Sequence, residues 1–279
     1  MAHADGADLY FERRGSGPPL LLIAGGGGDC GVYGPLADLL AADFTVLTYD
    51  RRGNSRSPLH YPPRPIQVDE QSGDALVVLQ ANGFAEASVY GSSGGASITF
   101  ELVARYPEVV ERALIHEPPI PSVLPDGADI LAQYAEHDRI REAEGWEAAF
   151  RWFLRINDLV PPNRPEMADY LLAPDRFLPP GRALDAALRM NGNWGYMCAY
   201  EVRPCIDYIP DLDRIAAGGT RLAFGCGEST GATFFHRAAR ELARRLSVEC
   251  FEFPGGHAGF AEVPAAFAAT LRACLRTLE

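Results

Sequence analysis

The chain has 279 residues, of which 25 are basic and 37 acidic, giving a net charge of −12. All 25 basic residues are arginines, and this excludes chemistry that needs a lysine: Schiff bases, phosphate loops of the GxxxxGK[ST] type and protein-kinase catalysis. The acidic balance argues against nucleic acid as a partner, because nucleic-acid affinity comes mainly from basic patches.

The sequence shows no signal for export or for a membrane. Apolar runs such as Leu20 to Ala24 are far shorter than the roughly 20 residues that a spanning helix needs. The first nine residues contain two aspartates and lack the basic start and apolar run of a secretory signal. The six cysteines are scattered without a CxxC pair, which favours reduced thiols over disulfides or a metal site. We therefore expect a cytoplasmic protein with no bound metal.

The first third of the chain alternates strand and helix patterns. Strands alternating with helices predict a mainly parallel sheet covered by helices on both faces, the α/β class. The predicted strands span 8–13, 20–24, 44–49, 87–90 and 113–116, and the predicted helices span 32–40, 68–79 and 95–105.

The alternation stops at Glu117-Pro118-Pro119. From there to about Pro210 the chain combines many prolines with helical stretches and all three tryptophans, and no strand pattern occurs. The sheet pattern then returns with a strand over 221–224, a helix over 234–246, a strand over 248–253 and a helix over 264–278. We predict one core domain formed by residues 1–117 and 211–279, with residues 118–210 inserted as a helical cap.

A nucleophile motif lies between a predicted strand and a predicted helix. The segment Gly91-Ser92-Ser93-Gly94-Gly95 matches GxSxG, in which the serine occupies a strained strand-to-helix turn. Such a turn leaves no room for a Cβ two residues before or after the nucleophile, so the register selects Ser93 over Ser92. The alternative interpretation is a small-residue turn that only joins the two elements.

A candidate base follows the strand over 248–253. His257, in Gly255-Gly256-His257, lies in a loop at the C-terminal end of that strand, where it can act as a general base. Serine first and histidine near the C-terminus is the order expected of a nucleophile and its base on this kind of sheet. The competing interpretation is an ordinary surface histidine.

The glycine run over 25–28 has two interpretations. Acyl chemistry needs two backbone N–H donors for the oxyanion, and Gly26 and Gly94 are the candidates, with Gly27 as the neighbouring option. The same run begins a GxGxxG pattern with Asp50 about 20 residues further on, as in NAD(P)-binding proteins. We disfavour the dinucleotide interpretation, because another strand precedes the run and Ser93 and His257 would have no role.

Four stretches together resemble the α/β-hydrolase superfamily: the glycine loop at 24–28, YDRRGNSRS at 49–57, the GSSGG elbow and GGH at 255–257. The resemblance implies the α/β-hydrolase fold, a Ser-His-acid triad, an oxyanion hole and a cap. Ala24 departs from the family, which often has histidine there. Because the superfamily includes esterases, lactonases, peptidases, dehalogenases, lyases and receptors, the resemblance leaves the substrate open.

The acid of the triad has two candidates. In this family it commonly follows the strand after the insertion, where this chain reads Gly225-Cys226-Gly227-Glu228-Ser229, and we therefore favour Glu228. Glu117 is the alternative, because some members supply the acid from the end of the preceding strand. Without a catalytic role, Glu117 is expected to be a buried glutamate paired with an arginine or a backbone donor.

The other polar residues are interpreted as structural. Arg51 and Arg52, with Arg56 nearby, offer a site for an anionic substrate group, but a solvated turn that pairs with acids is favoured. His116 and the remaining histidines are expected to be surface residues or satisfied core groups.

These expectations combine into one predicted function. The protein is expected to be a serine hydrolase that cleaves an ester, lactone or related acyl bond of a small or medium-sized, partly apolar molecule without a cofactor. Trp194 and Met197 are candidates for lining the substrate pocket. The alternative is a hydrolase-fold protein that does not hydrolyse, either a cyclase or lyase or a ligand-binding receptor. No nucleic-acid or membrane partner is expected, and a homo-oligomer is left open.

Overall fold

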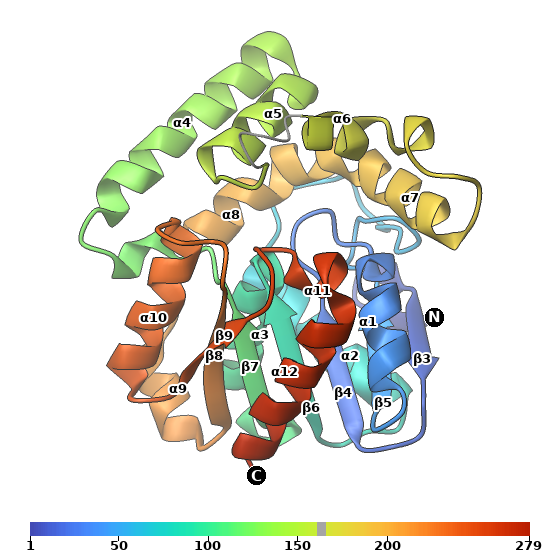
Figure 1. The fold of residues 1–279 in the computed structure, drawn as a ribbon, viewed down its shortest axis with the longest axis vertical. Helices are drawn as coiled ribbons and strands as arrows, with labels where there is room; N and C mark the ends of the chain where they lie inside the picture. Colours follow the sequence, from blue (N-terminus) through green and yellow to red (C-terminus); the bar gives the residue numbers. More distant parts are fainter. Residues whose placement is uncertain (161–165) are drawn as a thin grey trace.

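The computed structural model describes residues 1–160 and 166–279 and has a seven-stranded sheet at its centre (Figure 1). The strand order is β3-β5-β4-β6-β7-β8-β9, with β3 antiparallel to β5 and all other neighbours parallel. The mainly parallel α/β sheet predicted from the sequence is confirmed. The strands are β3 (Phe11–Arg14), β4 (Pro19–Ile23), β5 (Thr45–Tyr49), β6 (Ala87–Ser92), β7 (Val110–His116), β8 (Arg221–Gly227) and β9 (Cys250–Phe253).

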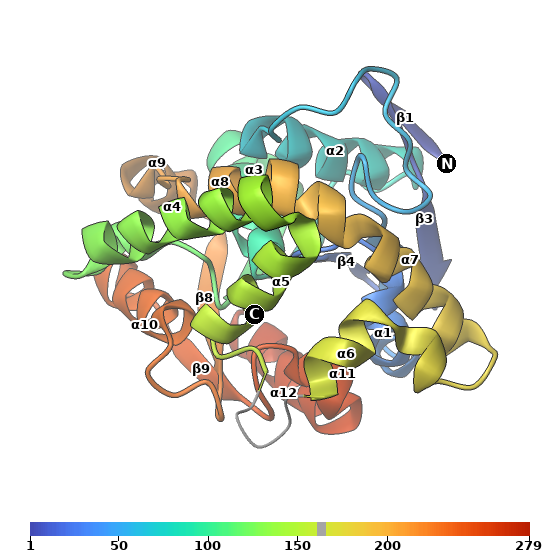
Figure 2. The ribbon, with the colours of Figure 1, turned by 90° about the horizontal axis from the view of Figure 1, so that it is seen from above.

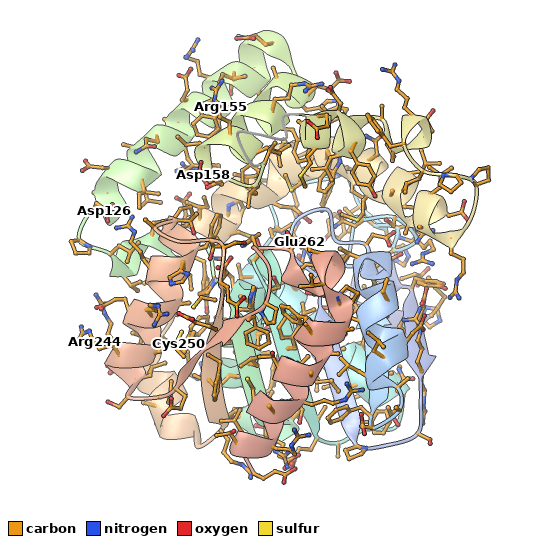
Figure 3. All side chains as sticks on the ribbon, viewed as in Figure 1. Asp126, Arg155, Asp158, Arg244, Cys250 and Glu262 are labelled. Atoms are coloured by element: carbon orange, nitrogen blue, oxygen red, sulfur yellow. The ribbon has the colours of Figure 1, made fainter. Side chains whose placement is uncertain are left out.

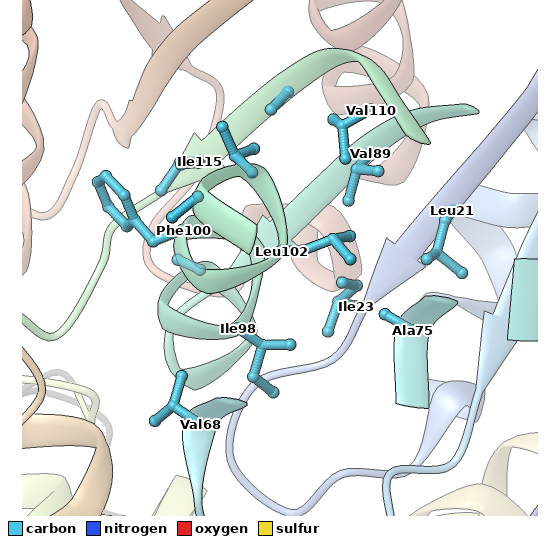
Figure 4. Close-up of a cluster of buried hydrophobic side chains, with 14 of the residues drawn as sticks. Leu21, Ile23, Val68, Ala75, Val89, Ile98, Phe100, Leu102, Val110 and Ile115 are labelled. Carbon is cyan, nitrogen blue, oxygen red and sulfur yellow. The ribbon is translucent and has the colours of Figure 1, made fainter. Parts of the chain in front are cut away.

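Helices cover both faces of this sheet, and an apolar core lies on each side. Because successive strand residues point to opposite faces, Leu21 and Ile23 of β4 join one core while Leu20 and Leu22 join the other. The first core packs under α2 (Val68–Ala81), α3 (Gly94–Arg105) and α10 (Phe234–Leu246), and Figure 4 shows its centre around Phe100 and Leu102. The second packs under α1 (Gly34–Leu40), α11 (Gly259–Glu262) and α12 (Pro264–Thr277).

The N-terminus forms a small hairpin that the sequence patterns did not predict. Strand β1 (Ala2–Ala4) pairs with β2 (Ala7–Leu9) around Gly6, whose φ of +74° favours glycine. The single strand predicted over 8–13 is therefore wrong in detail. It is divided at Tyr10 into the end of this hairpin and the start of β3.

Residues 118–210, which we call the cap, lie across the C-terminal ends of the strands (Figures 1 and 2). In its described part the cap has helices and no strand. Its own apolar core is formed around Tyr134, Phe150 and Trp194, and it includes Phe234 and Phe235 of α10. The cap helices are α4 (Gly127–Glu144), α5 (Trp146–Ile156), α6 (Glu166–Leu172), α7 (Arg182–Tyr196), a π-helical turn (Met197–Glu201) and α8 (Val202–Ile206). Helix α9 (Leu212–Gly218) then leads into β8.

Across the described ranges, every helix is too short or too polar to cross a lipid bilayer.

Candidate active site

Ser93 lies at a sharp turn between β6 and α3. Its φ of +56° and ψ of −125° are values that a residue with a Cβ rarely adopts, and they mark local strain. The turn is held by the Ser93 N–H, which donates to the carbonyl of His116 at 3.0 Å. A Cβ on Gly91 would lie 2.1 Å from the Thr99 hydroxyl, and one on Gly95 would lie 2.2 Å from the Ile23 carbonyl. The two glycines therefore permit the turn for the steric reason expected from the motif.

His257 forms a hydrogen-bonded pair with a carboxylate at the C-terminal end of β7. Its Nδ1 lies 2.5 Å from Oε2 of Glu117, the residue that follows β7. A carboxylate can only accept, so Nδ1 carries the proton and Nε2 of the neutral ring is left free to accept another. The ring also packs against Phe235, with 4.6 Å between ring centroids. Among the described residues, Ser93 Oγ and His257 are not joined by a hydrogen bond.

Glu117 is fully buried and tied on both carboxylate oxygens. Oε1 accepts the Gly227 N–H at 2.9 Å and the Thr230 hydroxyl at 2.5 Å, while Oε2 faces His257. Burial alone would raise the pKa of this carboxyl, but hydrogen bonds from His257 and Thr230 and the nearby His116 outweigh it and lower the pKa to about 2. Glu117 is therefore an ionised carboxylate that orients the His257 ring.

The favoured assignment of the acid to Glu228 is wrong in this structure. The Glu228 side chain is exposed, and its backbone N–H donates to the Phe253 carbonyl at 2.9 Å. The reason lies at the end of β8, where the Gly227 N–H binds the carboxylate of Glu117. The alternative, Glu117, already occupies the position beside His257 that an acid following β8 would need.

A small cavity of about 30 Å³ lies in front of the nucleophile turn, with Ser93, Gly26 and Gly94 among its lining residues. Of the two side chains predicted to line the substrate pocket, Met197 of the cap borders this cavity and Trp194 does not. The remaining walls are mostly apolar and come from Pro119, Phe153, Val202, Cys205, Ile206 and Phe235, together with the charged Arg51 and Glu201. Such a lining suits an apolar group next to the reacting atom.

The glycine loop after β4 forms a tight turn closed by the Gly28 N–H, which donates to the Gly25 carbonyl at 3.1 Å. Gly27 has a φ of +76° and is covered by Trp194, whose ring would lie 2.5 Å from a Cβ there. Gly26 instead is exposed and shares the cavity with Gly94, the first residue of α3. Of the three glycines predicted for the oxyanion hole, two therefore border the cavity beside Ser93.

Asp50, the acidic residue of the dinucleotide pattern, has a structural task. One carboxylate oxygen accepts the Cys30 N–H at 2.8 Å, and the other accepts Nε of Arg56 at 2.7 Å. Asp50 thus fastens the end of β5 to the glycine loop and to the following turn. A carboxylate with both oxygens occupied is not available for the ribose of a cofactor.

Arg51 and Glu201, which also line the cavity, form an ion pair. The Arg51 Nη2 lies 2.7 Å from Glu201 Oε2 and also donates to the Gly25 carbonyl at 2.8 Å. The two side chains are 1% and 2% exposed, so the solvated turn predicted for Arg51 is wrong, although pairing with an acid is right. Burial works against the charged form of Arg51, but Glu201 outweighs it and raises the pKa of the guanidinium.

A family model described as "Alpha/beta hydrolase family" matches residues 20–270. The chain belongs to the α/β hydrolase family. It is 33% identical over 261 residues to the uncharacterized hydrolase YraK of Bacillus subtilis, a match that covers 91% of this chain and 88% of that protein. It is 37% identical over 158 residues to the zearalenone hydrolase of Cladophialophora bantiana, covering 52% of this chain and 59% of that protein.

Solved structures of the family share the same fold. The enol-lactonase from Burkholderia xenovorans LB400 superposes with a TM-score of 0.68 at 20% identity, with 98% of both chains covered. A thermophilic esterase from Thermogutta terrifontis gives a TM-score of 0.72 at 17% identity, covering 98% of this chain and 94% of that one. The hydrolase enzyme class and the fold inferred from the four sequence motifs are thereby confirmed.

Proposed function

We propose that this α/β hydrolase cleaves esters or lactones with Ser93, His257 and Glu117 as its triad. The observation that carries the proposal is that the strained Ser93 turn and the Glu117-oriented His257 both follow C-terminal strand ends at the same edge of one sheet. Strand β6 precedes Ser93, β7 precedes Glu117, and β9 precedes the loop of His257. An activated serine with an oriented base is the arrangement that acyl transfer requires.

The proposed reaction uses Ser93, Gly26 and Gly94, which line the cavity, together with the pair of His257 and Glu117. Nε2 of His257 takes the Ser93 proton as Oγ attacks the carbonyl carbon of the substrate. For this proton transfer, Nε2 and Oγ must approach within roughly 2.6–3.2 Å of each other. The Gly26 and Gly94 N–H groups stabilise the resulting oxyanion, and the protonated His257 then gives its proton to the leaving alcohol. Glu117 stabilises the charged imidazolium throughout. Water, activated by the same histidine, then releases the acid from Ser93.

The cavity supports a small acyl group in the substrate. Its volume of about 30 Å³ leaves little room beside Ser93. An acetyl or propionyl group, or a small lactone ring reaching toward the opening, fits this space better than a long acyl chain.

Labelling with a fluorophosphonate probe tests the proposal. An activated serine forms a covalent adduct that intact mass spectrometry detects, and Ser93→Ala should abolish it while Ser92→Ala should retain it. Labelling together with turnover of a nitrophenyl ester supports hydrolysis. An unlabelled wild-type protein would instead favour the non-hydrolytic alternatives, a cyclase or lyase or a ligand-binding receptor.

A further inference from the structure

A chain of hydrogen bonds continues from Glu117 away from the cavity. Thr230, in the turn after β8, donates its hydroxyl to Glu117 Oε1 at 2.5 Å and lies 3.0 Å from His236 Nδ1. Nε2 of His236 in turn accepts Nε of Arg240 at 2.9 Å. His236 and Arg240 are one turn apart on α10, so their side chains lie on the same face of that helix.

Arg240 fixes the direction of the two hydrogen bonds at His236. A guanidinium can only donate, so Nε2 of His236 must accept and the proton of the neutral ring is on Nδ1. This Nδ1–H then donates to the Thr230 oxygen. The single hydroxyl proton of Thr230 is left to point onward to Glu117.

The hydroxyl has one competing acceptor, the Gly227 carbonyl at 2.8 Å. The Glu117 oxygen is closer, at 2.5 Å, and it is charged, and bonds to charged acceptors are the stronger ones. If the hydroxyl turned to Gly227, an oxygen lone pair would face the Glu117 carboxylate and push it out of place. The His236 Nδ1–H occupies the Thr230 lone pair that faces His236, so the hydroxyl proton cannot turn toward that ring.

We propose that Thr230 and His236 are positioning residues, forming with Arg240 a one-way hydrogen-bond relay that holds Oε1 of Glu117 and leaves Oε2 for His257. The proposal rests on the proposed role of Glu117 as the acid of the triad. Each member acts through the next, and none of them touches the substrate. By drawing charge toward Oε1, the relay also moderates the pull of Glu117 on the His257 proton.

Removing the Thr230 donor should therefore change both rate and pH dependence. Thr230→Val should lower kcat about tenfold, the equivalent of one hydrogen bond to a charged group, with KM unchanged. The acidic limb of the kcat/KM profile should move to higher pH, because an unshared carboxylate charge favours the protonated imidazole of His257. The other titratable groups acting on or near Glu117 are Tyr90 of β6, His116 of β7, Cys226 of β8, Cys250 of β9 and His236 of α10, and all stay in place in this variant.

The matched variants separate the relay from simple packing. Thr230→Ser restores the hydroxyl and should return kcat and the acidic limb to wild-type values. His236→Asn keeps a donor near the Nδ1 position and should retain most of the activity. His236→Phe removes the donor and should lower kcat about threefold, with the acidic limb moved to higher pH as in Thr230→Val. Arg244→Met is the control, because Arg244 lies on the outer flank of α10 (Figure 3) and, among the described residues, its side chain pairs with Glu241 alone.

The tautomer of His236 supplies a test that does not depend on activity. Nitrogen-15 NMR of histidine-labelled wild-type protein should show Nδ1 protonated and Nε2 bare, and Arg240→Met should let the second tautomer appear. An Nε2-protonated wild-type ring would overturn the relay even in a fully active enzyme. The relay would also be overturned if Thr230→Val kept the wild-type kcat and pH profile while fluorophosphonate still labelled Ser93. If labelling fails but the tautomer is as stated, the proposed function is wrong and the hydrogen-bond direction stands.

Discussion

The guanidinium of Arg51 joins the cap to the glycine loop, because one nitrogen, Nη2, binds both the Glu201 carboxylate and the Gly25 carbonyl. Glu201 ends the π-helical turn of the cap, and Gly25 precedes the proposed oxyanion donor. The second oxygen of Glu201 accepts the Asn54 amide at 2.9 Å. A single buried charge therefore links the placement of the cap to the geometry of the loop, in addition to the Asn193 amide, which donates to the Gly27 carbonyl at 2.6 Å.

Removing one partner of this pair should destabilise the fold and slow turnover. Glu201→Gln leaves the Arg51 charge uncompensated, and we expect a loss of about 3 kcal/mol in the free energy of unfolding, measured with urea. The double variant Arg51→Met, Glu201→Met should recover part of that loss, because no charge is then buried. Stability in Glu201→Gln equal to that of the wild type would show that the pair carries no such coupling.

The acid can be identified by two parallel substitutions. Glu117→Gln should reduce kcat for a nitrophenyl ester by roughly a thousandfold or more, because an amide cannot balance the charge of the imidazolium. Glu228→Gln changes an exposed side chain and should stay within twofold of the wild type. Steady-state kinetics of the two purified variants, each with circular dichroism as a check on folding, decide between them. The reverse ranking would return the role to Glu228.

The strain at Ser93 predicts a gain in stability when activity is lost. Ser93→Gly and Ser93→Ala both remove the nucleophile and should both be inactive. Only glycine adopts a φ of +56° without strain. Ser93→Gly should therefore have a free energy of unfolding about 1 kcal/mol higher than that of Ser93→Ala, and it should melt at a higher temperature. Thermal unfolding of the pair measures this difference directly. Equal melting temperatures would mean that the turn stores no measurable strain.

The small cavity predicts a sharp preference for short acyl chains. Nitrophenyl acetate should be turned over with a higher kcat/KM than nitrophenyl octanoate in the wild type. Met197 borders the space beside Gly26, where its sulfur would lie 2.6 Å from an added Cβ. Met197→Ala should therefore move the preference toward longer chains, whereas Leu188→Ala, an exposed position on α7, should leave it unchanged. A wild-type preference for octanoate would contradict the assignment of the acyl site.

His116 gives the stability of the protein a defined pH dependence. Burial lowers the pKa of this ring from 6.5 to about 4, and neither ring nitrogen has a hydrogen-bond partner within the described ranges. Between pH 6.5 and 4 the unfolded chain binds a proton here that the folded chain does not, so stability falls as the pH falls. The full effect of this shift is about 3 kcal/mol.

His116→Phe should flatten that dependence while keeping the ring contacts with Phe253 and Phe267. The measurement is the free energy of urea unfolding at several pH values above and below 5 in both proteins. Glu117 acts at lower pH, since its pKa of about 2 makes its stabilisation disappear only below pH 4.5. An equal slope in the variant and the wild type between pH 6.5 and 4 would exclude His116 as the source.

Local chemistry determined which parts of the site were predictable from sequence. Ser93 and His257 were found because a strained turn needs glycines at fixed spacing and a loop histidine is marked by its flanking glycines. The choice between Glu117 and Glu228 depended on which strand end lies beside His257, and spacing along the chain does not contain that information. For the same reason Arg51 was taken as solvated, since its partner Glu201 is 150 residues away in a segment without a motif.

Thr230 and His236 had no sequence signal at all. A threonine in a turn and a histidine on a helix are ordinary residues until the fold brings them to the carboxylate. The helix over 234–246 was predicted with the bounds that the structure shows, because its apolar spacing is regular. The function of its polar face depends on what it packs against.

The position of Glu117 limits how caps can be exchanged between members of this family. The carboxylate of Glu117 binds His257 of the core domain, and Glu117 is also the residue immediately before Pro118, where the inserted segment begins. A chimaera joined before Glu117 would take the proposed acid from the donor protein, and one joined after Pro119 would keep Glu117. An engineered exchange of caps should therefore be joined at Pro118-Pro119, where the cap can be replaced without replacing the proposed acid.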